Sequence, residues 1–173
     1  MATLQEALGY ELRTPNAFQR LVQNAGSSPP GAWVLSKVLE PADKLVARVT
    51  KGRATAAGVL ASLPVVTLTT TGARSGERRT SPLLGIPLEG TLAVMGTNYG
   101  QPATPAWVYN LEANPTAEVT YNGATSPVVA RPADDADFDR AFERAALVYP
   151  GYQKYQQRIT NRRIRVFILA VAP

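Results

Sequence analysis

From Val65 onward, apolar and polar residues alternate along this chain, and turn-forming residues cut the alternation into short segments. Alternation with a period of two, rich in β-branched residues, is typical of strands that bury one face. About six such strands are enough to close a sheet on itself. We therefore predict a mainly β protein of the α+β class, in which a small β-barrel carries peripheral helices. The segments predicted as strands are residues 65–71, 79–86, 91–96, 117–121, 124–132 and 164–171.

Two helices are predicted between these strands. Thr104 is suited to cap a helix that begins at Pro105, and Asn114 and Pro115 would end it. The second predicted helix runs from Asp134 to Leu147, because acids at its start favour the helix dipole and its apolar residues share one face.

The residues before the barrel follow a different pattern. Residues 33–51 place apolar side chains at helical spacing between Lys and Arg, which predicts a pair of basic amphipathic helices. Such helices pack on their own domain or make a peripheral contact with a membrane or a partner, and both alternatives stay open. Residues 27–31 form a loop, so the order of the leader before residue 31 is doubtful. We predict a helical extension over residues 1–60 and a cofactor-binding barrel domain over residues 61–173.

The absence of two residue types restricts the chemistry. The 173 residues include no His and no Cys, which excludes a Ser-His-Asp triad, a Cys/His zinc cluster and a His-ligated haem. We therefore predict no metal site and expect the reactivity to come from something bound. The net charge of +5 suits an anionic ligand, an acidic membrane surface or nucleic acid.

The same composition bears on location. Without Cys, and without a secretory signature in Met1–Tyr10, we expect a cytoplasmic protein, with membrane association through the basic helices left open. The most apolar stretch, residues 54–68, is shorter than the roughly 20 residues that a membrane span needs.

The segment 67–82 has the character of an anion site. A β-branched strand leads into a turn that contains Gly72 and Gly76, whose backbone freedom allows amides to point outward. Arg74, Arg78 and Arg79 would add charge-assisted contacts to a phosphate or carboxylate. The alternative is a hairpin whose basic tip only confers solubility.

Two further segments resemble parts of a site. Residues 94–102 leave a strand into a polar loop that would offer amides and a hydroxyl to an anion, although a plain loop is equally natural. Tyr149, Tyr152 and Tyr155 would line one side of a helical turn, as a core or interface stripe or as an adaptable wall against a planar ligand.

The order of three motifs resembles a known family. Leu-Thr-Thr-Thr-Gly-x-x-Ser-Gly-x-x-Arg-x-x-Pro-Leu at 68–83 is followed by Pro-x-Trp-x-x-Asn-Leu-x-Ala-Asn-Pro at 105–115 and Tyr-Pro-x-Tyr-x-x-Tyr at 149–155. Together they are similar to the deazaflavin-dependent nitroreductase family, which includes mycobacterial nitroreductases and quinone reductases that use coenzyme F420. The resemblance implies a split β-barrel of the FMN-binding type. It also implies hydride transfer from reduced F420 to a quinone, a nitroaromatic or an activated C=C or C=N bond.

The resemblance also implies the residues of the site. Tyr149, Tyr152 and Tyr155 would wall the acceptor, and Tyr149, Tyr152 and Thr97 are the candidates for stabilising it or relaying a proton. The phosphate and the acidic tail of F420 would meet the glycine turn. The cofactor-binding residues implied are Ala73, Arg74, Ser75, Arg79, Thr80, Ser81, Pro82, Leu83, Leu84, Met95, Gly96, Thr97, Asn98, Ala106, Trp107, Val108, Tyr109, Asn110 and Tyr152.

Departures from the family pattern and rival functions remain. Relatives often carry basic residues where this chain has Ala73 and Asn98, and Arg78 would restore part of that charge. FMN is a less favoured cofactor, haem or a tetrapyrrole still less, and a carrier without turnover is a further alternative. The arginines near the last strand fit a solvated rim or the acidic cofactor tail better than nucleic acid, which we do not expect as a partner. Both a monomer and a homodimer are consistent with the sequence, as are a broad reductase and a dedicated biosynthetic one.

Overall fold

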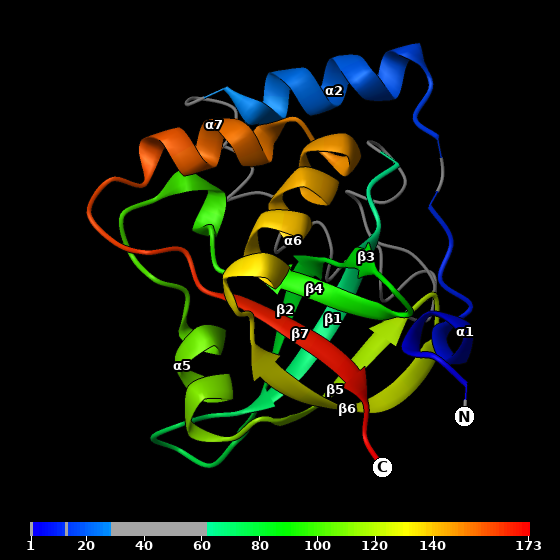
Figure 1. Ribbon diagram of the computed structural model, residues 1–173, viewed down its shortest axis with the longest axis vertical. Coiled ribbons are helices and arrows are strands. Elements are labelled where there is room, and N and C mark those ends of the chain that lie inside the picture. Colours follow the sequence, from blue (N-terminus) through cyan, green and yellow to red (C-terminus); the bar gives the residue numbers. More distant parts are fainter. Residues whose placement is uncertain (1, 13, 29–61) are drawn as a thin grey trace.

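The computed structural model describes residues 2–12, 14–28 and 62–173, and the predicted helix pair of residues 33–51 lies outside them. A curled sheet is surrounded by helices (Figure 1). No helix in these described ranges is both long enough and apolar enough to cross a bilayer. The helices are α1 (Leu4–Leu8), α2 (Ala17–Ser27), η1 (a 3₁₀-helix, Asn98–Gly100), α5 (Ala106–Ala113), α6 (Asp135–Val148) and α7 (Gly151–Arg158). The strands are β1 (Val65–Thr71), β2 (Arg78–Leu84), β3 (Ile86–Leu88), β4 (Thr91–Met95), β5 (Thr116–Tyr121), β6 (Ala124–Pro132) and β7 (Val166–Val171).

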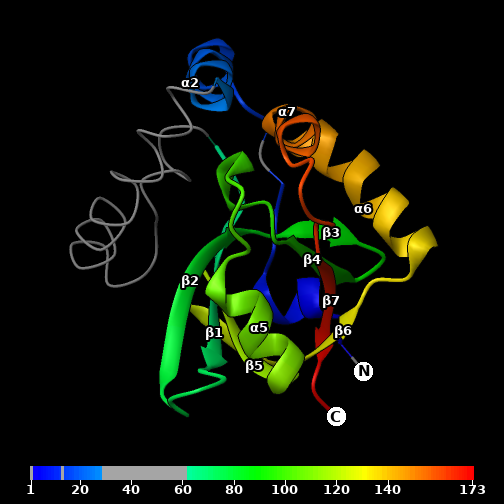
Figure 2. The same ribbon diagram turned by 90° about the vertical axis from the view of Figure 1, so that its left-hand side faces the viewer.

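The strands form one antiparallel sheet in the order β2-β1-β5-β6-β7-β4-β3. The outermost strands, β2 and β3, are consecutive in the chain and are separated only by Gly85. The sheet therefore curls on itself, as the side view shows (Figure 2). Glycine suits this bend because a Cβ there would lie 3.0 Å from Cγ1 of Val66. The predicted barrel of about six strands is confirmed, with the predicted strand 79–86 bent into β2 and β3.

One apolar core fills the inside of the curled sheet. In β1 the side chains of Val66, Leu68 and Thr70 are buried while their neighbours are partly exposed, which is the alternation expected of a strand with one inner face. The inner core joins residues of the strands, α1 and α5: Leu4, Leu8, Val66, Leu68, Leu92, Val94, Trp107, Val108, Leu111, Val119, Tyr121, Val128, Ala130, Phe167 and Leu169.

A second core lies on the outer face of the same sheet. α6 and α7 cover this face, and α6 lies against β3 (Figure 2). Val94 of β4 points inward, whereas its neighbours Ala93 and Met95 point outward into the second core. The outer core contains Ile86, Ala93, Met95, Ala141, Phe142, Ala145, Tyr149, Tyr152, Tyr155, Ile159, Ile164, Val166 and Ile168.

The start of the chain is part of the barrel. Leu4 and Leu8, one helical turn apart in α1, are almost completely buried in the inner core. Thr3 and Glu6 form a reciprocal capping box that fixes the start of this short helix. The sequence did not reveal this role because two leucines in a short segment give too little periodicity to indicate where they pack.

Two tyrosine hydroxyls attach the same segment to the sheet. Tyr10 donates a 2.6 Å hydrogen bond to the carbonyl of Gly85, and Tyr121 donates one of 3.1 Å to the carbonyl of Glu11. The rings of Tyr10 and Tyr121 are also in contact, with centroids 5.0 Å apart. The N-terminal segment therefore secures the bend that closes the barrel. The predicted domain boundary near residue 60 lies outside the described residues and stays a prediction.

Candidate functional site

The turn between β1 and β2 is built by its own backbone. The amide of Gly72 donates to the carbonyl of Glu77 at 2.8 Å, and the amide of Gly76 donates to the carbonyl of Gly72 at 2.9 Å. Gly76 has a φ of +67°, and a Cβ on Gly72 would lie 2.6 Å from Oγ of Ser75. Both glycines are therefore needed for this shape. In the described part of the chain, no acceptor is found for the amides of Arg74 and Ser75, which belong to exposed residues, so these two backbone donors are available to a ligand.

Asn110 of α5 supports the turn from behind. Its Oδ1 accepts a 3.0 Å hydrogen bond from the amide of Ala73, and its Nδ2 donates to Oγ1 of Thr70 at 3.0 Å. Asn110 is buried, so its bond to Thr70 is shielded from water, and its bond to Ala73 is partly shielded. The structure thus gives Asn110 and the Ala73 amide a role in shaping the turn, whereas their predicted contact with a cofactor stays a prediction.

The arginines of β2 lie on opposite faces of the sheet. Arg79 is paired with Thr70, whose side chain is on the inner face, whereas Arg78 is paired with Thr71 on the outer face. Arg78 forms an ion pair with Glu118 at 2.5 Å on the face away from Arg79, and its predicted contribution to the charge of the site stays a prediction. Arg79 pairs with Glu77 at 2.6 Å in an exposed bridge, and such bridges contribute about 0–1 kcal/mol. A phosphate or carboxylate can therefore compete for Arg79.

The other β2 residues implied by the family resemblance alternate in the same way. The register places Ser81 and Leu83 on the inner face with Arg79, and Leu83 packs against the inner core. Thr80, Pro82 and Leu84 lie on the outer face, and Leu84 packs against the outer core. Within the described sheet only β1 pairs with β2, which leaves the other edge of β2 as the side along which a ligand can reach the strand.

The predicted site residues of α5 lie in different environments. Trp107 and Val108 are buried in the inner core, and Trp107 meets Phe167 edge-on with centroids 6.0 Å apart. Tyr109 is 49% exposed on another side of the helix. Five consecutive helical residues point in different directions, so Ala106 to Asn110 cannot all contact one ligand with their side chains. The helix begins one residue later than predicted, with Pro105 at the N-cap position and no side-chain cap from Thr104.

The loop after β4 lies next to α5. A Cβ on Gly96 would approach Cγ2 of Val108 to 2.9 Å, so a glycine lets the loop pass directly over the helix. Thr97 is 6% exposed, and Asn98 donates from Nδ2 to the carbonyl of Ala103 at 3.0 Å. α5 thus joins the glycine turn, through Asn110, to this loop, through Val108. The first two predicted parts of the site, the glycine turn and the loop after β4, therefore both contact α5.

The three tyrosines form a buried cluster in the outer core. Each is 4% exposed, and the hydroxyls of Tyr149 and Tyr155 are 3.2 Å apart in a mutual hydrogen bond. Burial raises the pKa of Tyr149, Tyr152 and Tyr155 above the usual value, so all three are neutral hydroxyls at physiological pH. A Cβ on Gly100 would lie 3.2 Å from Cδ1 of Tyr155, which places the cluster against the loop after β4. Their predicted contact with an acceptor stays a prediction.

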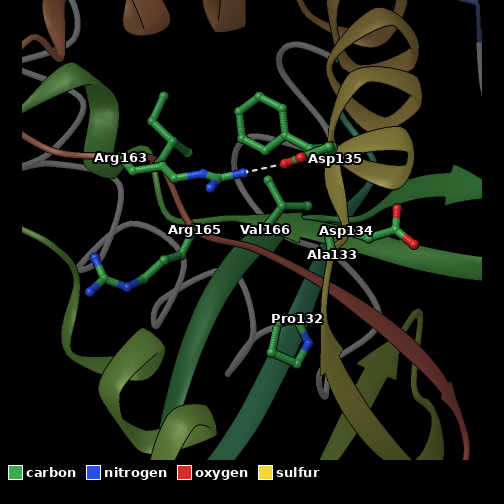
Figure 3. A pocket seen from close by; sticks show the side chains of 9 residues that line it. Pro132, Ala133, Asp134, Asp135, Arg163, Arg165 and Val166 are labelled. Carbon is green, nitrogen blue, oxygen red and sulfur yellow. Dashed lines mark hydrogen bonds and ion pairs between the residues drawn. The ribbon is translucent and has the colours of Figure 1, made fainter.

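A cavity that the sequence did not predict lies elsewhere. It has a volume of about 300 Å³ and opens where β6 leads into α6 and the chain enters β7 (Figure 3). Arg163 and Asp135 form a 2.7 Å ion pair across it, and Arg165 pairs with Glu112 at 2.6 Å. Each of these arginines therefore has a carboxylate partner. Among the described residues, no cluster of acidic side chains has the arrangement of a metal site.

Sequence comparison finds relatives over most of the chain. The family model for F420H(2)-dependent quinone reductases matches residues 43–170. An F420H(2)-dependent quinone reductase of Mycobacterium tuberculosis strain H37Rv is 31% identical over 109 residues, which are 61% of this chain and 72% of the relative. A relative from Mycobacterium bovis matches to the same extent.

Comparison with solved structures also finds an F420-dependent reductase among the similar proteins. A structure described as an F420-H2 dependent reductase (FDR-A) superposes with a TM-score of 0.57 at 36% identity, covering 61% of this chain and 93% of the other. Another, described as a domain-swapped dimer, has a TM-score of 0.59 at 30% identity and covers 81% of this chain and 98% of its own.

The curled antiparallel sheet with its covering helices is a split β-barrel of the kind found in F420-dependent reductases. The chain belongs to the F420H(2)-dependent quinone reductase family. The resemblance drawn from the three motifs is thereby confirmed, together with the predicted enzyme class of oxidoreductase and the predicted cofactor, coenzyme F420.

Proposed function

We propose that this protein binds reduced F420 along β2 and uses it to reduce a quinone-type acceptor placed beside the loop after β4. The observation that carries the proposal is the glycine turn, which Asn110 holds and in which the amides of Arg74 and Ser75 have no acceptor among the described residues and lie next to basic side chains. Backbone amides and arginines in this arrangement fit the phosphate and the acidic tail that F420 carries. The donor set therefore fits the cofactor that the family uses.

The chain's own residues have positioning roles in this proposal. Bound F420 supplies the hydride, and the sequence contains no His or Cys that could act as a nucleophile or a strong general base. Arg79 leaves its exposed bridge with Glu77 to bind the anionic part of the cofactor. Thr97, next to the close approach of Gly96 and Val108, donates a hydrogen bond at the reacting end. Correct placement of two reactants accounts for about 7–11 kcal/mol of a barrier, so orientation is the main contribution of the protein.

The tyrosines have a more restricted role than the sequence suggested. Because Tyr149 and Tyr155 bond to each other inside the outer core, their hydroxyls are engaged in the described structure. We propose that the cluster supports the loop after β4 through Gly100 and that Tyr152 meets the acceptor only at its edge. A raised pKa excludes a tyrosinate base at neutral pH and leaves each phenol as a hydrogen-bond donor.

The choice of acceptor is the finer part of the proposal. A quinone is favoured because the curated relatives are named quinone reductases, and nitroaromatic or activated C=C and C=N acceptors are the second group to test. A homodimer is proposed only as an alternative to a monomer, on the strength of the relative described as a domain-swapped dimer. A cytoplasmic location stays a prediction. The predicted membrane contact concerns residues outside the described ranges and has no support here.

The test is a titration of the purified protein with oxidised and reduced F420, followed by an acceptor screen with menadione and a nitroaromatic. We expect saturable F420 binding and oxidation of reduced F420 that depends on both protein and menadione. FMN in place of F420 is the control, and its tighter binding would support the rival cofactor. Saturable F420 binding without turnover of any acceptor would instead favour a carrier.

A further inference from the structure

Arg162 makes an unusual set of contacts with the loop after β4. This loop, from Gly96 to Pro102, is called loop 96–102 below. Nη1 of Arg162 donates to the carbonyl of Gly96 at 2.8 Å, and Nε donates to the carbonyl of Pro102 at 3.1 Å. Nη2 donates to the carbonyls of Thr97 and Gln101, both at 3.3 Å. One guanidinium group therefore binds both ends of the loop and two of the carbonyls between them.

The loop that Arg162 holds has a strained backbone. Asn98, Tyr99 and Gly100 follow one another with φ values of +47°, +55° and +78°, all in the left-handed region. Residues other than glycine rarely adopt this region, and two of them in succession persist only when the surroundings enforce it. Loop 96–102 therefore requires an external support to keep its shape.

Two nearby arginines differ from Arg162 in what they contact, and Asn161 reaches only one end of the loop, with a 3.4 Å hydrogen bond to the carbonyl of Pro102. Arg163 pairs with Asp135 at 2.7 Å, and Arg165 pairs with Glu112 at 2.6 Å, so each is directed at a carboxylate. Arg162 instead directs its donors at backbone carbonyls. Only arginine offers five N–H donors in a planar fork, whereas a lysine has three donors on one nitrogen and cannot reach both ends of the loop together.

We propose that Arg162 is a positioning residue of the cofactor site, which holds loop 96–102 in its left-handed shape and so places Thr97 and Asn98 for the cofactor. The inference rests on the proposed function, in which this loop lies at the reacting end of F420. Thr97 and Asn98 lie between two carbonyls that Arg162 binds, so loss of the guanidinium fork releases both residues together. Arg162 itself need not touch the cofactor.

The experiment compares Arg162→Lys and Arg162→Met with the matched control Arg163→Lys, whose ion pair is exposed at the surface. Amide hydrogen exchange of the cofactor-free protein reports on the loop, and titration with oxidised F420 reports on the site. Kinetics with reduced F420 and menadione then separate the KM of the cofactor from that of the acceptor.

In Arg162→Lys we expect faster exchange confined to loop 96–102 and an affinity for F420 about tenfold lower, as the loss of one or two hydrogen bonds implies. The KM for reduced F420 should rise more than the KM for menadione, because Arg162 holds the residues placed for the cofactor. A loss of folded protein would instead lower the apparent kcat and leave both KM values unchanged. Arg163→Lys should match the unaltered protein in all three measurements. If Arg162→Met does not fold, Arg162→Lys alone decides.

Two results would overturn the proposal. One is unchanged exchange and unchanged F420 affinity in Arg162→Lys, and the other is faster exchange across the whole chain, which would make Arg162 a general support of the fold. If the unaltered protein does not bind F420, the proposed function fails. The exchange data would still show whether Arg162 holds the loop, so the two failures can be told apart.

Discussion

Asn110 and Ala73, which are 37 residues apart in the sequence, are joined by a 3.0 Å hydrogen bond from the backbone amide of Ala73 to the side-chain oxygen of Asn110. The same side chain donates to Thr70 in β1, so the glycine turn is held by α5 as much as by its own strands. The geometry of the proposed anion site therefore depends on a residue that need not contact the anion.

Replacing Asn110 with Ala should lower both stability and cofactor affinity. The substitution removes the acceptor of the Ala73 amide and the donor to the buried Thr70 hydroxyl, which keeps its 3.4 Å bond to the carbonyl of Arg79. Loss of two hydrogen bonds of this kind costs about 1–3 kcal/mol of unfolding free energy. Urea unfolding and F420 titration measure the two effects. Asn114→Ala is the control, because it also removes side-chain hydrogen bonds at the end of α5 but these bonds go to Thr116 and not to the turn. An Asn110→Ala variant with normal F420 affinity would show that the turn keeps its shape unaided.

The two neighbouring arginines of β2 should differ in their effect on cofactor binding. Arg79→Ala should weaken F420 binding by about 1.5–3 kcal/mol, the usual contribution of a charge-assisted hydrogen bond. Arg78→Ala should have little effect, because Arg78 lies on the other face and pairs with Glu118. Equilibrium titration at one fixed salt concentration compares them. Equal losses in both variants would mean that long-range charge, rather than the face of the strand, governs binding.

The close approach of Gly96 to Val108 should be sensitive to a single methyl group. In Gly96→Ala the new Cβ would lie 2.9 Å from Cγ2 of Val108, so we expect a loss of about 1–3 kcal/mol in stability from overpacking. Shortening Val108 to Ala removes the methyl group that the new Cβ would meet. The double variant Gly96→Ala/Val108→Ala should therefore lose less stability than the sum of the losses in the two single variants. Thermal unfolding of the four proteins forms the cycle, and strict additivity would contradict the contact.

Because of Asp137, the free energy of unfolding should decrease as the pH becomes acidic. Its side chain is 3% exposed and lies between Arg131 and Arg140, whose hydrogen bonds lower the pKa of the carboxyl group below its usual value. A lowered folded-state pKa means that the stabilisation is fully present above the unfolded pKa of about 3.9 and is lost as the pH falls through the folded value.

Asp137→Asn should therefore be less stable than the unaltered protein at neutral pH, and the difference should shrink on acidification below about pH 4. Asp139→Asn, an exposed change on the same helix, is the control and should cause little loss at any pH. Urea unfolding across this pH range measures the trend. A stability difference for Asp137→Asn that does not vary with pH would show that the loss comes from packing alone.

The sequence predicted the elements whose pattern is local. β1 and β6 appear where the period of two placed them, and α6 lies within one residue of its predicted bounds, with Asp134 as the capping residue. The glycine turn was predicted because its residues carry their backbone preferences with them. These features depend on residues that are close together in the sequence, so local sequence patterns are enough to predict them.

What the sequence did not show depends on pairing between distant segments. The face on which Arg78 or Arg79 lies follows from the register with β1, and Arg162 became interpretable only when its guanidinium was seen among four loop carbonyls. Likewise, α1 gives no sign of where it packs until a barrel exists to receive Leu4 and Leu8. A run of positive φ values beside an unassigned arginine is the structural signal that would have drawn attention to loop 96–102.

The bend at Gly85 has a consequence for how the molecule opens. Since one residue connects the strands at the two ends of the sheet order, peeling β2 away from β1 pulls β3 away from β4 as well. In a flat sheet the two edge strands can fray independently of each other. Here the edge strands β2 and β3 are linked by one residue, so they should fray together. The ring of strands should consequently come apart in a single concerted event, and whatever keeps Tyr10 on the carbonyl of Gly85 delays that event for the entire barrel.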